Sequence, residues 1–364
     1  MEPAAGPAQS PPMIPARLPG PRSLIPGLAA CAAVALAAVA VQALELRLLG
    51  RGWIDAIVLA ILIGAAIRSV WTPPAALRPG VEFSARTLLE IAVVLLGASV
   101  SAATVMAIGP GLLAGTAVVV VLALAVSYGL GRLLRLPHRM AVLIACGNAI
   151  CGNSAIAAVA PVIDADAEDV SAAIAFTAVL GVAVVLLLPL LGALLQMTDV
   201  RYGVLAGLTV YAVPQVLAAT MPVGAVATQA GTLIKLVRVL MLGPVVLGLA
   251  VLTAFGREGE AGPVQEGAKT PRRGVALHQL VPWFIVGFLL MMGARSLDLI
   301  PASALPVMSE TTKVLTVLSM AALGLSTDAR AVARSGVRIA SVVVLSLLAL
   351  MGLALGLIYL LALT

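Results

Sequence analysis

Charge, aromatic rings and cysteine are scarce in this chain. Of its 364 residues, 10% are charged and 3% are aromatic, and it has three cysteines and two histidines. An ordinary soluble domain has about 25% charged residues, so a water-soluble globule is excluded. The cysteines, Cys31, Cys146 and Cys151, all lie in apolar segments. This argues against a disulfide framework, and Cys-x4-Cys is a poor spacing for zinc.

Catalytic motifs are also lacking. The histidines, His138 and His278, stand beside arginines or a helix start, and no phosphate-binding loop, zinc motif or Ser–His–acid pattern occurs. We therefore expect no enzyme activity, no cofactor and no bound metal. The net charge of +6 comes from residues beside apolar segments without aromatic interleaving, so no nucleic-acid partner is expected.

Long apolar segments are what the chain has instead, since 62% of its residues are hydrophobic. A membrane span needs about 20 such residues. The pattern predicts an all-α, polytopic transmembrane bundle of about ten to eleven helices in a lipid bilayer. The eleven segments are about Leu24–Leu44, Trp53–Ile67, Leu88–Ile108, Leu112–Leu134, Met140–Ile163, Val170–Leu195, Val204–Ala219, Gly231–Phe255, Leu280–Ala294, Val307–Leu325 and Ile339–Leu363.

Lysine and arginine are divided unequally between the gaps that separate the apolar segments. With the N-terminus placed inside, sixteen fall in inside gaps and three in outside gaps. This is the positive-inside signature, which predicts a multi-pass plasma (inner) membrane protein with a cytoplasmic N-terminus. The remaining three, Lys235, Arg238 and Lys313, lie within apolar segments.

Two hydrophilic stretches organise the chain. Residues 1–22 read as a disordered cytoplasmic N-terminus, followed by a retained first helix or, as the alternative, a cleaved signal peptide. Residues 256–278 read as a cytoplasmic linker between a first transmembrane block, 23–255, and a C-terminal block, 279–364.

A weak internal repeat relates Val94–Gly111 to Ser319–Arg338. By the count of crossings the two copies point in opposite directions, and inverted repeats are typical of many secondary transporters. A chance match of small residues is the alternative. The residues matched at constant offset are Gly97, Ser99 and Gly109 with Gly324, Ser326 and Gly336.

Two segments are predicted to be broken within the membrane. The fifth carries two copies of Cys-Gly-Asn, ending at Asn148 and Asn153. Glycine weakens a helix and Asn competes for backbone hydrogen bonds, so a new helix should start near Asn153 and Ser154 and present free N–H groups to an anion. A continuous helix with small packing residues is the alternative. The seventh segment carries Pro214 and Gln215, which predicts a second break or, alternatively, a Pro-kinked helix.

Lys235 and Arg238, spaced i, i+3, share one face of the eighth segment. A cation in hydrocarbon costs about 2.5–3.5 kcal/mol even on lenient scales, so the pair needs an anion, an acidic partner or water, unless it snorkels to the interface. The acidic run Asp164–Asp169 is expected in an outside loop.

In this order, four runs resemble the YeiH-like sulfate exporter family: Gly147–Ile163, Val213–Thr220, Lys235–Pro244 and Met320–Asp328. The resemblance covers about Arg78 to Arg338. It implies an inner-membrane secondary transporter related to bile-acid symporter and cation:proton antiporter-like folds, with discontinuous helices. That family often has a His-Glu pair before the Gln-Val run, where this chain has Tyr211 and Ala212, so it lacks a carboxylate there that could couple transport to protons.

Our leading hypothesis is a secondary transporter, in the exporting direction, for a small anion, with a sulfate- or sulfite-type oxyanion preferred. A cation/proton antiporter and a non-transporting membrane subunit are the alternatives, and a homodimer is left open. The residues expected to form the binding site are Asn148, Gly152, Asn153, Ser154, Gln215, Lys235, Arg238, Ser99 and Ser326.

Overall fold

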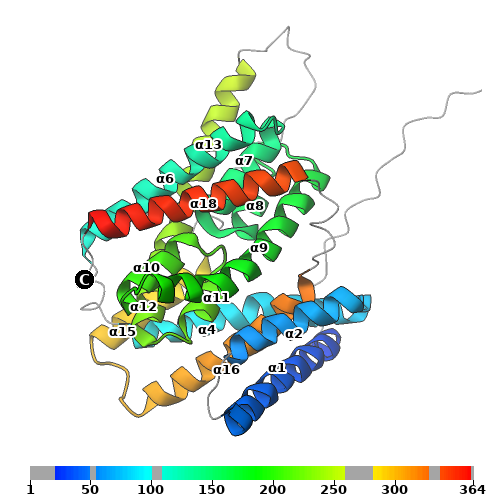
Figure 1. The fold of residues 1–364 in the computed structure, drawn as a ribbon, viewed down its shortest axis with the longest axis vertical. Coiled ribbons are helices and arrows are strands. Elements are labelled where there is room, and N and C mark those ends of the chain that lie inside the picture. The colour runs from blue at the N-terminus through cyan, green and yellow to red at the C-terminus, as the bar shows by residue number, and fades with distance from the viewer. Residues whose placement is uncertain (1–20, 50–54, 101–108, 259–281, 328–336, 362–364) are drawn as a thin grey trace, which may run out of the picture.

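The computed structural model describes residues 21–49, 55–100, 109–258, 282–327 and 337–361, which form helices and their connections without a strand (Figure 1). The predicted N-terminal tail lies outside these residues, except that helix α1 already begins at Pro21, and most of the predicted linker also lies outside them. Within the described part, five helical stretches are long and apolar enough to cross a membrane. The predicted all-α polytopic bundle is therefore confirmed. The five are Arg22–Leu48, Pro110–Leu133, Ala167–Leu194, Ala225–Thr253 and Val337–Leu360.

The helices pack as two groups, which Figure 1 shows one below the other. In the lower one, which we call the α2–α16 group, α16 packs along α2 and α4. Helix α1 packs on α2 and α16, and helix α15 packs on α4. Close crossings depend on glycine, because a side chain at Gly64 or Gly324 would overlap the backbone of the other helix. The members are α1 Pro21–Leu49, α2 Ala56–Val70, η1 Ala75–Leu77, α3 Arg78–Phe83, η2 Ser84–Leu88, α4 Leu89–Leu96, η3 Gly97–Ser99, α15 Trp283–Ser296 and α16 Ala304–Ser326.

The other group, which we call the hairpin group, holds the remaining helices that the structure describes. It meets the α2–α16 group chiefly where α11 and α9 face α16 and α2. Gln229 adds a hydrogen bond between the groups, from Nε2 to the Ser99 carbonyl oxygen at 2.8 Å. Its members are α6 Pro110–Leu133, α7 His138–Cys146, η4 Gly147–Cys151, α8 Asn153–Val159, α9 Ala167–Leu194, α10 Asp199–Thr209, α11 Val213–Thr220, α12 Ala225–Leu240, α13 Leu242–Glu258 and α18 Val337–Leu360.

Helices α6 and α18 each follow one copy of the weak repeat and lie side by side. The Leu357 side chain lies against Gly115, and the Val342 side chain reaches the neighbourhood of Gly131. These two pairs place the start of α6 beside the end of α18, so the helices run antiparallel. This direction is the one expected of an inverted repeat.

The fifth apolar segment does not cross the bundle. It enters as α7 and η4, reverses and returns as α8, and we call this unit the first hairpin. The Arg139 guanidinium lies 3.7 Å from the Asp166 carboxylate, so the two ends of the segment are at the same end of the bundle. The acidic run was expected in an outside loop and Arg139 in an inside gap, but the structure places both at one end, because a re-entrant segment has the hydropathy of a span.

Helices α10 and α11 form a second hairpin. The Tyr202 hydroxyl near its start donates to the Ala219 carbonyl near its end at 2.8 Å, and the Asp199 carboxylate lies beside Gly224. Because α9 crosses the bundle between them, the two hairpins enter from opposite ends. Helix α10 runs parallel to α12, with Gly203 against Ala227 and Gly207 against Gly231. Small residues at this spacing allow close helix packing in membranes.

Candidate functional site at the hairpin tips

The tip of the first hairpin is a reversal at Gly152. This residue has φ of 65° and ψ of −124°, a conformation that essentially only glycine adopts. A β-carbon there would also come within 3.2 Å of the Tyr211 β-carbon, at the tip of the second hairpin. Helix α8 begins at Asn153, as predicted, and the continuous-helix alternative is wrong.

The tip of the second hairpin is the extended stretch from Val210 to Ala212. Helix α11 starts at Val213 with Pro214 in its first turn, where the missing N–H breaks no helical hydrogen bond. The predicted second break is therefore present, and the alternative of one kinked helix is wrong.

Lys235 and Arg238 of α12 join the two tips, and both are 0% exposed. Lys235 Nζ donates to the Ile150 carbonyl at 2.6 Å and to the Val210 carbonyl at 3.0 Å. Snorkelling to the interface is thus the wrong explanation for this pair. The Arg238 guanidinium donates to four carbonyl oxygens: Ala149 at 3.1 Å, Gly207 at 2.9 Å, Val210 at 3.1 Å and Asn148 at 2.8 Å.

These carbonyls belong to the ends of η4 and α10, where a helix leaves its last four C=O groups without a partner. Cations suit the negative end of a helix dipole. One helix therefore neutralises the carbonyl ends of both hairpins, and the donors of Lys235 and Arg238 point at the backbone.

Asn153 is an exposed side chain at the tip of the first hairpin. Its Oδ1 atom lies 2.6 Å from the Thr177 hydroxyl of α9, which donates to it. The amide nitrogen Nδ2 has no hydrogen bond to the described residues. Asn153 thus turns an amide with two unused N–H donors outward.

Gln215 is its counterpart on the second hairpin and is 2% exposed. Its Oε1 atom accepts a hydrogen bond from the Ala212 backbone N–H at 3.1 Å. The amide lies over Gly181 of α9, where any added β-carbon would come within 2.6 Å of the amide atoms. Within the described part of the chain, Nε2 has no acceptor, so Gln215 also keeps two N–H donors.

The two amides share one face of α9. Thr177 and Gly181 are four residues apart, which is about one turn or 6 Å along the axis. Helix α9 has 28 residues and is about 42 Å long, and both positions lie in its middle third. The tips therefore meet near half depth, where polar side chains mark substrate or ion pathways.

The other predicted site residues are divided by the structure. Asn148 is buried and directs Nδ2 toward the Val343 carbonyl of α18 at 3.5 Å, while Ser154 is exposed beside Asn153. Ser99 and Ser326 end helices of the α2–α16 group, and each hydroxyl donates within its own helix. No described contact joins these two serines to the tips.

Known proteins with similar sequences identify the family of this chain. Residues 26–343 match the family described as Conserved hypothetical protein 698. A UPF0324 membrane protein of Brucella melitensis biotype 1 is 54% identical over 340 residues, covering 93% of this chain and 92% of that protein. The chain belongs to the UPF0324 family of membrane proteins. The resemblance to the YeiH-like family fits this membership.

Other UPF0324 membrane proteins are also similar over most of their length. One of Bradyrhizobium diazoefficiens is 51% identical over 337 residues, covering 93% of each chain. One of Clostridium tetani is 32% identical over 292 residues, covering 80% of this chain and 83% of its own. No solved structure matches this UPF0324 chain.

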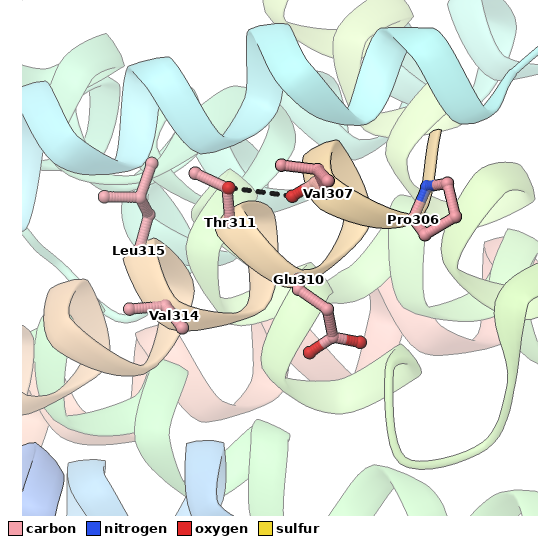
Figure 2. Close-up of a pocket in the computed structure, with 6 residues that line it drawn as sticks. All are labelled: Pro306, Val307, Glu310, Thr311, Val314 and Leu315. Atoms are coloured by element: carbon pink, nitrogen blue, oxygen red, sulfur yellow. Dashed lines mark hydrogen bonds between the residues drawn. The ribbon is translucent and has the colours of Figure 1, made fainter. Parts of the chain in front are cut away.

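A hollow of about 490 Å³ lies on the surface of α16, and none of the residues that line it belongs to the tips (Figure 2). Pro306, Val307, Glu310, Thr311, Val314 and Leu315 line it. Glu310 is paired there with Lys313 at 2.8 Å. All six lining residues come from one helix and most are apolar, so this hollow of the UPF0324 chain lacks the converging polar groups of a binding site.

Thr177 and Gly181 are residues of the site that sequence reasoning missed. Both lie in a segment that was read as a plain apolar span. The sequence feature that could have identified them is a hydroxyl and a glycine four residues apart in the middle of a long apolar helix. That spacing puts a hydrogen-bonding group and a gap on one face.

Proposed function

We propose that this protein is a secondary transporter of a small anion, with sulfate- or sulfite-type oxyanions preferred and export as the direction. The observation that carries the proposal is the pair of amides at the tips. In both Asn153 and Gln215 the amide oxygen accepts a hydrogen bond from the protein and the N–H donors are free. The two amides lie against positions one turn apart on α9. Anions accept such hydrogen bonds, whereas a cation needs oxygen ligands.

Lys235 and Arg238 support the same proposal in an indirect way. They occupy the carbonyl oxygens that two broken helices leave at half depth. Without them these oxygens would repel an anion. The cations thus favour the anion by covering acceptors and through their charge at short range.

Transport requires the site to open to each side in turn. The division into a hairpin group and an α2–α16 group offers such a movement, because both tips and their cations lie within one group. We propose that the hairpin group moves as a unit against α2 and α16, in the inner membrane with the N-terminus cytoplasmic. The excess of arginine in the gaps on that side supports this orientation.

The test is uptake of labelled sulfate and sulfite into liposomes containing the purified protein. Wild type should show anion-dependent uptake, and Asn153→Ala and Gln215→Ala should each lower it at least about tenfold, as expected for loss of a hydrogen bond to a charged ligand. Ser171→Ala is the matched control, because this exposed hydroxyl bonds only the Ala167 carbonyl of its own helix turn. Flux that depends on sodium or protons but on no anion would instead favour the antiporter.

A further inference from the structure

The Asn153 amide can face the candidate site in two ways. With its oxygen toward Thr177 it presents two N–H donors, and turned over it would present its oxygen. These two orientations suit ligands of opposite charge. The group that fixes the amide therefore decides which kind of ion the tip can bind.

The geometry at Thr177 favours the first orientation. Its hydroxyl oxygen lies 2.6 Å from Asn153 Oδ1, 3.0 Å from the Ile174 carbonyl and 3.2 Å from the Ala173 carbonyl. A hydroxyl has one proton to give, and the shortest of the three contacts is the one to Asn153. A separation of 2.6 Å fits an O–H···O bond, and it is shorter than the usual N–H···O distance of about 2.9–3.0 Å.

The Gln215 amide has no such choice. Its oxygen faces the Ala212 backbone N–H, which can only donate. With the Thr177 hydroxyl bonded to the Asn153 oxygen, the first tip presents N–H donors, as the second tip does. The carbonyls of Asn148, Ala149 and Val210 behind the tips are occupied by Lys235 and Arg238.

We propose that Thr177 is a positioning residue that holds the Asn153 amide as a donor, as the Ala212 N–H holds that of Gln215, so that the site selects oxyanions without a proton over oxyanions that carry one. Sulfate has only acceptor oxygens and can use every donor. Hydrogen phosphate must give its own proton to an acceptor, and neither outward-facing amide offers one, so its binding is weaker. This inference rests on the proposed function and names the class of substrate.

The experiment measures binding in detergent by thermal shift and by calorimetry, with sodium sulfate and sodium phosphate titrated separately at neutral pH and constant ionic strength. Three forms are compared: wild type, Thr177→Ser, which keeps the hydroxyl, and Thr177→Val, which keeps the shape and removes it. A fourth form, Asn153→Asp, keeps the oxygen that accepts the hydrogen bond from Thr177 and replaces the outward N–H donors by a second oxygen.

Wild type and Thr177→Ser should bind sulfate at least about tenfold more tightly than phosphate, the factor that one hydrogen bond to a charged group supplies. Thr177→Val should bring the ratio of the two dissociation constants close to one. Asn153→Asp should lose sulfate binding, and this result tests the inference even if Thr177→Val does not fold.

Two results overturn the inference: an unchanged ratio in Thr177→Val, or sulfate binding retained in Asn153→Asp. If wild type binds an anion but Thr177→Val keeps the preference, only the role of Thr177 fails. If wild type is stabilised by no anion, the proposed function fails with it.

Discussion

Replacing Arg238 by methionine is the sharpest test of how the broken helices are held. Its guanidinium bonds four carbonyl oxygens on two hairpins and is 0% exposed. Methionine fills a similar elongated space but has no donor. The Val210 carbonyl would keep its bond to Lys235, while the carbonyls of Asn148, Ala149 and Gly207 would lose their side-chain donor.

The cost follows from those three oxygens. A buried polar group left without a partner costs about 1–3 kcal/mol, so Arg238→Met should lower the free energy of unfolding by about 3–9 kcal/mol. Native proteins have about 5–15 kcal/mol in total. Since 1 kcal/mol corresponds to about 2–4 °C in domains of 150–250 residues, the melting temperature should fall by at least about 5 °C.

The measurement is thermal unfolding of purified protein in one detergent, beside Lys313→Met as the matched control. Lys313 is also a cation in an apolar segment, but its pair with Glu310 has side chains 56% and 70% exposed. Such a pair contributes about 0–1 kcal/mol. If Arg238→Met melts with the control, the guanidinium is not needed to cap the hairpins and our account of the tips is wrong.

Three further predictions concern the hairpins. Gly152→Ala should lower the melting temperature by several degrees, because an alanine forced to positive φ costs about 1–3 kcal/mol; the same melting temperature as wild type would contradict the reversal. Gly181→Ala should lower sulfate uptake at least about tenfold by displacing the Gln215 amide; normal uptake would show that the amide is not in the site. In sealed vesicles, an impermeant maleimide should label Asp166→Cys and Gly224→Cys from opposite sides; labelling from one side would rule out hairpins that enter from opposite ends.

The helix breaks could be predicted from the sequence because their causes are local. Two Cys-Gly-Asn copies weaken the helix before Asn153, and Pro214 with Gln215 does so in the seventh segment. The need of Lys235 and Arg238 for partners was also predictable, since the cost of a buried charge depends only on its place in an apolar segment.

What those partners are could not be predicted. The Lys235 and Arg238 donors reach backbone carbonyls up to 90 residues away, and a carbonyl has no signature in a sequence. The reversal at Gly152 could not be predicted for a related reason. A segment that crosses the bilayer and one that turns back within it have the same hydropathy. The error of reading it as a span assigned Arg139 and the acidic run to opposite sides, whereas the structure places them together. The positions of Ser99 and Ser326 could not be predicted either, since both end helices of the α2–α16 group.

The single helix that serves both hairpins also sets an order for biogenesis. Both hairpins emerge from the ribosome before α12, and until Lys235 and Arg238 follow, their carbonyl ends have nothing to bond within the lipid. The nascent chain must therefore keep them near water or translocon until residue 238 has entered the membrane. Insertion of α12 then locks two re-entrant loops from opposite leaflets in one late step.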